Sequence, residues 1–587
     1  MNALLKIISL TLTLTFYLNL QAAYLTDVPV KVTQPDGIVL NIFATGDEFY
    51  SWLHDENGYT IVQDQTNGFY CYAELIDDQL MPTNFLPGAD DPQISGLAPD
   101  INLPPEILEQ NIDIFTENVP ASITREDFVN VQGQVQINNI VVYIRFADQE
   151  EFTKDQSIYT DMFNKTGENV NSVANYFKES SYNKLDINST FYPANDGNII
   201  LSYQDSHDRS YYKPLTFTNS NGYAGGNDSA ERIKREHELV SNAMKFVKAE
   251  IPADLNIDFN NDNIIDNISF ILKGDEGEFR EILWPHRFAL YTSFEYINGK
   301  RIYDYIFLLE NRNDTGIACH EITHVFGAPD LYHRYRAFSI PVGRWDVMAN
   351  NNNPPQHTNA YIKYRYCGWI DNIPEITTNG TYSLNPLTMA TNNCYKIPLN
   401  NTNEYLLFEF RLNIGIFESQ LPDRGLLIYR INENYWGNFI VKPENSGGIN
   451  DEVYIFRPGG SIYRKGDYKK ANFSANHNRK EFSNTTDPFC FISNGSTCEV
   501  AIKNITAATG PRISFTVDFC DTGDIYYDNT SKIPPLTNAP NITATGQVIL
   551  EAVDTITFEA NEQIELNGGF EVKNGGVFTA KTVECNE

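Results

Sequence analysis

Cysteine is scarce in this sequence, with 8 cysteines among 587 residues. They are scattered, and no two are spaced as Cys-x-x-Cys, which excludes a zinc ribbon and a thioredoxin-type redox site. So few cysteines also exclude a small scaffold held together by disulfides. Cys490 and Cys498 flank a short Asn-Gly turn, and Cys520 and Cys585 could close the C-terminal segment, although spacing alone fixes neither pairing.

Basic residues are also few, with 43 Lys and Arg against 76 Asp and Glu and a formal net charge of −33. A surface this acidic repels phosphate backbones, so nucleic acid is excluded as a partner. The surplus of carboxylates instead supplies oxygen ligands for hard cations such as calcium. Nothing in the composition sets the oligomeric state.

Long hydrophobic runs are absent beyond the N-terminus. The chain begins with a positive charge at Lys6, an apolar run over 7–20 and a small-residue stretch ending at Ala23, the pattern of a cleaved export signal. A membrane anchor is the alternative, but the run is short for a spanning helix. We expect residues 1–23 to be a signal peptide, and the mature protein to be secreted or at the cell surface without spanning the membrane.

The remaining chain has enough apolar material for several packed cores, at 42% hydrophobic and 13% aromatic residues, and its length favours three or four domains. Short β-like runs come first and end in a Pro- and Asp-rich linker. Strands then alternate with helices, and short strands between Pro, Gly and Asn turns follow. The expected strands are 28–32, 37–43, 68–73, 139–146, 268–272, 405–410 and 425–431, and the expected helices are 172–178 and 230–249.

One segment carries clear chemistry, the run His320-Glu-Ile-Thr-His324. Residues four apart on a helix share one face, so both imidazoles can reach one metal ion. Glu321 then stands beside the first ligand, placed to accept a proton from a metal-bound water. The alternative is two histidines on the exposed face of an ordinary helix. The apolar flanks disfavour it, because buried histidines need partners.

The residues after this helix supply a third ligand. Gly327 can adopt positive φ and Pro329 cannot continue a helix, so the chain turns back and Asp330 can approach the metal. Two imidazoles and one carboxylate leave a fourth position for water, as in catalytic zinc sites. A gluzincin, whose third ligand is a Glu on a second helix well downstream, is the rival that Gly327 and Asp330 argue against.

A second element supports the first. Zinc peptidases with an extended HExxHxxGxx motif have a methionine-containing turn beneath the metal, and Met348 in the segment 343–349 stands at the corresponding place. A methionine alone is usually core filler, so this prediction depends on the motif before it.

These segments resemble the immune inhibitor A family of secreted bacterial zinc metallopeptidases, which share an HExxHxxGxxD motif. The resemblance covers roughly residues 135–435, and Phe410 departs from it by standing where a Glu-Asn-Arg segment usually has Asn. It implies an α+β fold with a metzincin-like catalytic domain, preceded by a β-rich propeptide and followed by a β-sandwich. The expected boundaries are 24–130 for the propeptide, 131–375 for the catalytic domain, 376–520 for the β-sandwich and 521–587 for a small C-terminal β-repeat module.

The predicted function is hydrolysis of peptide bonds in proteins by a secreted, zinc-dependent endopeptidase, with Glu321 as general base. The alternative from another class is a non-catalytic surface adhesin or carbohydrate-binding protein with a vestigial peptidase domain. Loss of Glu321 or His324 would have favoured it, and both are present. Two further residues are supporting candidates: His286, which lines the cleft or is structural, and Tyr332, which is one candidate for stabilising the oxyanion.

A calcium loop is expected over 258–266. Asp258, Asn260, Asp262 and Asp266 stand at positions 1, 3, 5 and 9 of an EF-hand-like series, with Asn263 at position 6 in place of Gly. No Glu stands at position 12, so the alternative is a polar turn before a strand.

Residues 24–130 are expected to keep the enzyme latent by covering its cleft. Cys71 is one candidate for a blocking ligand, although a buried structural cysteine fits its aromatic strand better. An acidic side chain of the linker, Asp90, Asp91 or Asp100, is the other. At the opposite end, segments 546–552, 555–560 and 563–569 repeat with a step of about eight residues, which predicts a small stacked β-coil with a binding, spacing or attachment role.

Overall fold

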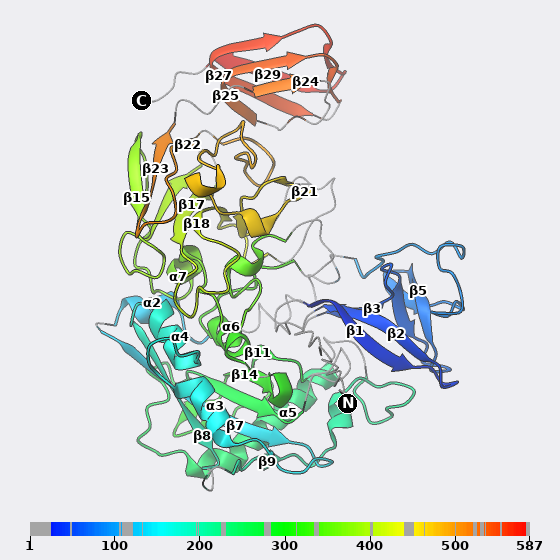
Figure 1. Ribbon diagram of the computed structural model, residues 1–587. Coiled ribbons are helices and arrows are strands. Elements are labelled where there is room, and N and C mark those ends of the chain that lie inside the picture. Colours follow the sequence, from blue (N-terminus) through cyan, green and yellow to red (C-terminus); the bar gives the residue numbers. More distant parts are fainter. Residues whose placement is uncertain are drawn as a thin grey trace, which may run out of the picture.

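The computed structural model describes residues 25–582 with gaps, and Figure 1 shows its elements in sequence colours. The predicted signal peptide lies outside the described residues. The segments left undescribed are 1–24, 47–49, 105–106, 108–120, 132, 195–196, 198, 225–229, 275–282, 313, 334–339, 400–402, 439–450, 463, 499, 520–524, 529–532, 534–535, 552–553 and 583–587.

The N-terminal part is an antiparallel sheet of six strands in sequence order. Its small core contains Val32, Leu40, Ile42, Ile61 and Tyr72. The short strands predicted here are confirmed. The strands are β1 (Leu25–Thr33), β2 (Val39–Gly46), β3 (Ser51–His54), β4 (Thr60–Gln63), β5 (Tyr70–Ile76) and β6 (Gln79–Pro82).

A mixed sheet organises the next part, with strand order β11-β14-β10-β7-β8 and a short β9 beside β7. Five of these strands are parallel, and β11 is an antiparallel edge strand paired with β14. Parallel strands covered on both faces need continuous apolar runs, and β10 is buried along its whole length. The bounds are β7 (Val135–Arg145), β8 (Leu185–Tyr192), β9 (Tyr203–Gln204), β10 (Ile268–Leu272), β11 (His286–Ala289) and β14 (Asp304–Leu309). Between the last two, β12 (Tyr296–Ile297) and β13 (Lys300–Arg301) form a separate two-stranded sheet.

Helices cover both faces of this mixed sheet. Val141 and Tyr143 of β7 share one core with α3, α4 and α6, whereas Ile140 and Val142 share a second core with α5. Alternate strand residues point to opposite faces, so the sheet separates the two cores. The mixed helix and strand content predicted from the sequence is confirmed. The helices are α2 (Arg125–Val129), α3 (Gln156–Asn164), α4 (Val173–Ser180), α5 (Ala230–Val247), α6 (Thr315–Val325) and α7 (Ala360–Arg365).

Helix α2 belongs to this helical body, although the expected boundary at 130 assigns it to the propeptide. Ile123 and Phe128 lie in the same core as α6. Arg125 donates hydrogen bonds to the carbonyls of Tyr364 and Asp371 at 2.8 and 2.9 Å. Residues 123–128, which the expected boundary places in the propeptide, therefore pack with the body that holds α6.

The N-terminal sheet contacts the helical body at two places. Ala44 of β2 packs with Trp284, which is buried two residues before β11 begins. The ring of Phe217 lies against Gly68. The sheet is thus docked beside the edge of the mixed sheet where β11 starts.

The β-rich part predicted beyond residue 375 contains two larger antiparallel sheets, β15-β23-β22 and β16-β17-β18-β19, and the two-stranded sheet β20-β21. Phe408 and Phe410 of one sheet share a core with Phe515 of the other. The opposite face of β17 and β18, with Leu407 and Tyr429, packs into the core that contains α6. This part is therefore continuous with the helical body. Its strands are β15 (Gly380–Leu384), β16 (Cys394–Pro398), β17 (Glu404–Arg411), β18 (Gly425–Asn432), β19 (Val453–Ile455), β20 (Gly460–Ser461), β21 (Arg464–Lys465), β22 (Ala501–Lys503) and β23 (Ile513–Asp518).

The C-terminal strands stack in parallel, as expected for a β-coil. The predicted step of eight residues is wrong, because Val548 pairs with Phe570 and Thr555 with Val577, each 22 residues further along. The predicted repeat 555–560 and the first four residues of the repeat 563–569 lie in the single strand β27. The strands are β24 (Ile525–Asp528), β25 (Leu536–Thr545), β26 (Val548–Leu550), β27 (Thr555–Leu566), β28 (Phe570–Val572) and β29 (Val577–Thr582).

One of the two disulfide pairings considered from the sequence is present. Cys490 and Cys498 are joined, with an S–S distance of 2.02 Å. Cys520 and Cys585 lie outside the described residues. Across the described ranges, no helix combines the length and the apolar character needed to cross a membrane.

Candidate metal centre

Helix α6 presents the histidines of the motif. Its first turn is capped by Asp314, whose side chain accepts a hydrogen bond from the backbone N–H of Ile317 at 3.0 Å. Gly316 is required beside it, because a Cβ there would stand 2.0 Å from the carbonyl oxygen of Asn352. Gly327 follows the helix with φ of +83° and turns the chain back, as predicted from the sequence.

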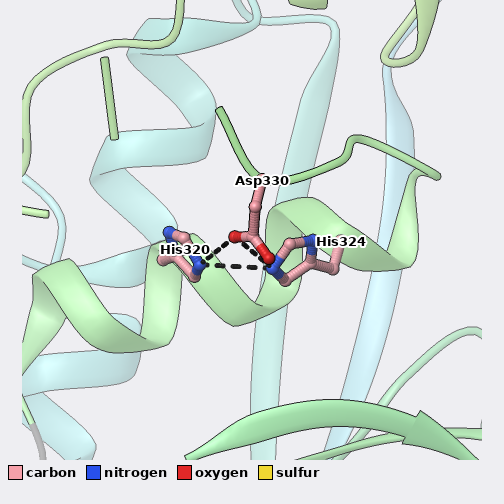
Figure 2. Close-up of side chains that lie close together, drawn as sticks. All are labelled: His320, His324 and Asp330. Atoms are coloured by element: carbon pink, nitrogen blue, oxygen red, sulfur yellow. Dashed lines mark hydrogen bonds and ion pairs between the residues drawn. The ribbon is translucent and has the colours of Figure 1, made fainter. Parts of the chain in front are cut away.

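Three ligand atoms converge at this turn. The Nε2 atoms of His320 and His324 are 3.2 Å apart. The Oδ1 atom of Asp330 lies 3.2 Å from the first and 3.4 Å from the second. Figure 2 shows the three side chains directed toward one another, two from α6 and one from the loop after it. This arrangement can hold a metal ion.

The remaining ring nitrogens are held by backbone carbonyls. Nδ1 of His320 lies 2.8 Å from the carbonyl oxygen of Val347, and Nδ1 of His324 lies 2.7 Å from that of Ala328. A carbonyl only accepts, so each Nδ1 carries a proton, and Nε2 is the nitrogen of each ring that is left to bind a metal. Such hydrogen bonds fix the tautomer and the orientation of ligating histidines.

Without a metal, the charges of His320 and Asp330 stabilise each other. Burial disfavours protonation of His320, but its hydrogen bond with Asp330 and the nearby Glu321 outweigh burial and raise the pKa of His320 to about 9. Burial likewise opposes ionisation of Asp330, yet the two histidines hold the pKa of Asp330 well below its usual range. The Asp330 carboxylate is therefore ionised and ready to bind a cation.

Glu321 is buried beside this group without belonging to it. Its side chain is 2% exposed. Among the described His, Cys, Asp and Glu side chains, the convergent group contains His320, His324 and Asp330 alone. Burial raises the pKa of Glu321 above its ordinary value, while the two histidines oppose that shift. A carboxylate with a raised pKa, next to a metal group, suits a general base.

The methionine turn lies against the centre through its backbone. The backbone N–H of Leu331 donates to the carbonyl oxygen of Met348 at 2.8 Å, and the preceding carbonyl, Val347, holds His320. Met348 itself is fully buried in the core that contains α6. The segment thus supports both the helix and the loop that carry the ligands.

Asp346 fixes this turn, and sequence reasoning missed it. Its buried carboxylate accepts hydrogen bonds from the backbone N–H of Met348 at 2.8 Å and of Asn359 at 2.7 Å. The hydroxyl of Thr358 donates to it at 3.0 Å. In the sequence, its position two residues before Met348 is the signal that could have identified it.

A buried arginine braces the turn from strand β17. Arg411 donates to the carbonyl oxygen of Trp345 at 3.0 Å and binds Glu418 through two hydrogen bonds of 2.6 Å. Glu409 accepts from the backbone N–H of Ala360 at 2.8 Å. Phe410 faces the opposite core, so its departure from the family pattern does not touch this brace.

His286 has both ring nitrogens occupied. Nδ1 lies 2.6 Å from the carbonyl oxygen of Trp284, and Nε2 lies 2.8 Å from Oε1 of Glu236. Both ring nitrogens are therefore engaged with protein groups and neither is directed at the metal ligands. Of the two roles considered from the sequence, this geometry favours the structural one. Tyr332 is buried within the loop that carries Asp330, and its role at an oxyanion stays a prediction.

The proposed calcium loop does not form a comparable group. Asp258 accepts from the backbone N–H groups of Asp262 and Asn263 at 3.1 Å, and its Oδ2 lies 2.6 Å from Nζ of Lys300. Both carboxylate oxygens of Asp266 accept from the N–H of Phe259. Asn263 has φ of +68°, as position 6 of such a loop requires. Calcium binding stays a prediction.

The latency candidates named from the sequence are held within the N-terminal part. Cys71 is buried in β5, and its thiol donates to the carbonyl oxygen of Phe69 at 3.6 Å. Asp90 and Asp91 accept hydrogen bonds from backbone N–H groups of their own linker, and the backbone N–H of Asp100 bonds the carbonyl of Gly58. If the N-terminal part blocks the metal centre, it must therefore do so through a contact other than these side chains.

Comparison with known proteins gives no match: no family model matches the sequence, and no curated protein matches it. A function for this chain must therefore follow from its own residues and their geometry. The feature with the clearest chemistry is the convergence of three ligand atoms beside a buried carboxylate.

Proposed function

We propose that this chain is a zinc-dependent endopeptidase of the metzincin-like, immune inhibitor A type. The observation that carries the proposal is the meeting of His320 Nε2, His324 Nε2 and Asp330 Oδ1 next to the buried Glu321. The methionine turn beneath them adds support, because this arrangement accompanies extended HExxHxxGxx motifs in zinc peptidases.

The spacing of the three atoms fits zinc. Tetrahedral zinc with ligand distances of about 2.0–2.1 Å places neighbouring ligand atoms roughly 3.3 Å apart. The three separations here are 3.2, 3.2 and 3.4 Å. Nitrogen and carboxylate donors also match zinc, and three protein ligands leave one position for water or substrate.

The residues around this centre have separate roles in the proposed reaction. Zinc, when bound, polarises the scissile carbonyl and lowers the pKa of water. Glu321 accepts the proton of the attacking water and delivers it to the leaving amine. Val347 and Ala328 hold the two imidazoles in the ligating tautomer, so no reorientation is needed before the reaction.

An extended peptide is the substrate that the surrounding sheet suits. β11 is the edge strand, and within the described strands it pairs with β14 alone. Helix α6 packs against both strands. A peptide bound in extended conformation alongside β11 would lie along α6, the helix that carries His320 and His324.

The rival assignments lose support at the site. A gluzincin takes its third ligand from a distant helix, whereas Asp330 lies in the loop directly after α6. A peptidase domain without activity would not need a buried Glu321 next to two histidines whose rings are held by hydrogen bonds. The β-rich part is also joined to the helical body by a shared core, which fits a single enzyme better than an adhesin with an idle peptidase domain.

We further propose that the protein is exported and that its N-terminal sheet keeps it latent. The sheet docks through Ala44 on Trp284, beside the start of β11. A substrate added to that edge would approach the same place. Removing the sheet is therefore expected to raise peptide hydrolysis, measured with the same peptide before and after limited proteolysis. Equal activity of the intact and trimmed chains would make the sheet a permanent accessory domain.

The position of the cut can be tested separately. A chain beginning at Ala121 keeps Ile123 and Phe128 in the core, whereas one beginning at Asn130 loses both. Loss of a buried Phe side chain alone costs about 3–5 kcal/mol. The longer chain should melt cooperatively and be active, and the shorter one should melt much lower. Equal melting temperatures would show that α2 is dispensable.

Calcium is the second proposed cation, and its effect should depend on pH. Burial, with Asp258 and Asp262 nearby, raises the pKa of Asp266 to about 8. Between about pH 4 and pH 8, the cation-free folded state therefore keeps a proton on Asp266 that the unfolded state has released. The free energy of unfolding of the cation-free protein falls as the pH rises through this range. Calcium should raise the melting temperature more at about pH 9 than at about pH 6.

Asp262→Ala is the variant that tests the loop. It should erase the calcium-dependent shift in melting temperature while the zinc content stays unchanged. A wild-type melting curve that calcium leaves unmoved at both pH values would remove the calcium site from the account.

A further inference from the structure

The loop from Gly327 to His333 carries the third ligand and contains neither helix nor strand. A ligand on such a loop is held only as firmly as the loop itself. The contacts that hold this loop come in large part from residues more than a hundred positions further along the chain, at the end of β18 and the start of β19.

The two ends of the loop are held by separate side chains. At the first end, the indole Nε1–H of Trp436 donates to the carbonyl oxygen of Gly327 at 3.3 Å. At the other end, Nε2 of His333 pairs with Oδ1 of Asp451. His333 and Asp451 are both buried, so water does not weaken this pair as it would on the surface.

Asn438 holds the middle of the loop, where the ligand stands. Its backbone N–H donates to the carbonyl oxygen of Asp330 at 3.2 Å. Its side-chain Nδ2 donates to the carbonyl oxygen of Leu331 at 3.2 Å and to that of Val453 at 2.7 Å. Its Oδ1 accepts from the N–H of Val453 at 3.0 Å. The side chain is fully buried.

Asn438 is itself fixed to a rigid element. Val453 belongs to β19, which pairs with β18 in the four-stranded sheet. That sheet packs one face into the core containing α6. The amide therefore connects the ligand loop to the same sheet that braces the methionine turn through Arg411.

We propose that Asn438 is a positioning residue for the metal centre, and that the β-rich part completes the centre by fixing the loop of Asp330. The inference rests on the metal ligands of the proposed function, and it assigns the β-rich part a role in metal binding. Asparagine suits this position because its amide supplies two donors and one acceptor at once. An aspartate of the same shape would accept from Val453 but could not donate to Leu331.

The test compares two buried asparagines in the β-rich part. Asn438→Asp removes both side-chain donors next to the ligand. Asn393→Asp is the matched control, because Asn393 is 4% exposed and donates to the carbonyl oxygen of Met389 at 2.6 Å and to the hydroxyl of Tyr182 at 3.0 Å. Both substitutions disturb a buried amide, and only the first disturbs the Asp330 loop.

Two readouts report on the centre and not on folding alone. Zinc affinity is measured by competition with a chromophoric chelator, and the visible spectrum of the cobalt-substituted protein reports the ligand geometry. Asn438→Asp should weaken zinc binding by about 10–100-fold and change the cobalt spectrum. Asn393→Asp should leave zinc affinity and the cobalt spectrum at wild-type values.

Trp436→Phe covers the case in which Asn438→Asp does not fold. Trp436 is 44% exposed, so phenylalanine should be tolerated while the hydrogen bond to Gly327 is lost. It should weaken zinc binding severalfold and shift the cobalt spectrum in the same direction. Wild-type zinc affinity in Trp436→Phe, and in Asn438→Asp where that variant folds, would overturn the inference and leave the proposed function standing. A wild-type protein that binds no zinc would overturn both.

Discussion

Glu321→Gln is expected to lower peptide hydrolysis by about 10²–10⁴-fold while the protein keeps its zinc. Glutamine preserves the volume of a side chain that is 2% exposed, so the fold and the ligand group should survive. It removes the carboxylate next to the ligands that is proposed to take up the proton of the attacking water. The measurement is the turnover of a quenched fluorescent peptide, with zinc per chain determined on the same sample.

His324→Ala is the contrasting variant. It removes a ligand, so metal and activity should be lost together. Turnover in Glu321→Gln within about tenfold of wild type, at full zinc content, would show that another group acts as the base. Loss of zinc from Glu321→Gln would instead place Glu321 among the ligands.

Asp330→Ala is expected to weaken zinc binding by well over 100-fold, beyond the range of about 10–100-fold found when a residue supporting a ligand is replaced. The carboxylate is buried, and its Oδ1 lies 3.2 and 3.4 Å from the two Nε2 atoms. The control is Asp371→Ala, because the side chain of Asp371 is 77% exposed and pairs with Lys184 at the surface. Zinc affinity should not change in that variant.

Full zinc occupancy in Asp330→Ala would contradict the ligand assignment. The third ligand would then lie elsewhere in the chain, and a gluzincin-like arrangement with a Glu from a second helix would again be the leading alternative. The pH dependence of zinc binding in wild type provides a further check, because zinc must displace a proton from His320, whose pKa is raised to about 9.

The residues of the centre were accessible from the sequence because they follow local rules. The spacing of His320 and His324 depends on the helical repeat, and Gly327 depends on backbone freedom at positive φ. Both are properties of a short segment. The structure places these residues, with Asp330, as the motif indicates.

The bracing of the centre could not be predicted in the same way. Asn438 and Leu331 are 107 residues apart, and no periodicity connects them. Arg411 and Glu409 lie in a strand whose two faces are both buried, so the strand does not show the alternation that would mark one face as charged and functional. Such contacts depend on how distant elements pack, and a single sequence does not encode that in a local pattern.

The domain boundaries show the same limit. The β-like runs and the Pro- and Asp-rich stretch after them predicted a propeptide ending near residue 130, yet Phe128 lies in the core with α6. A Pro- and Asp-rich composition indicates that a segment is irregular. A short amphipathic helix such as α2 has no distinctive composition, so its packing in the core cannot be predicted in this way. The spacing between paired strands of the C-terminal coil was also predicted wrongly. Strands that pair in parallel are joined by long connections, so they are not adjacent repeats in the sequence.

Zinc titration of the metal-depleted, processed protein tests the central claim most directly. The protein is stripped of metal with a chelator, and cleavage of an unfolded protein substrate is followed as zinc is returned. Activity should be absent at the start, rise in proportion to added zinc and reach its plateau at about one zinc per chain, as a single three-ligand centre requires. Cleavage that persists without metal, or no cleavage at full zinc occupancy, would contradict the assignment of this chain as a zinc endopeptidase.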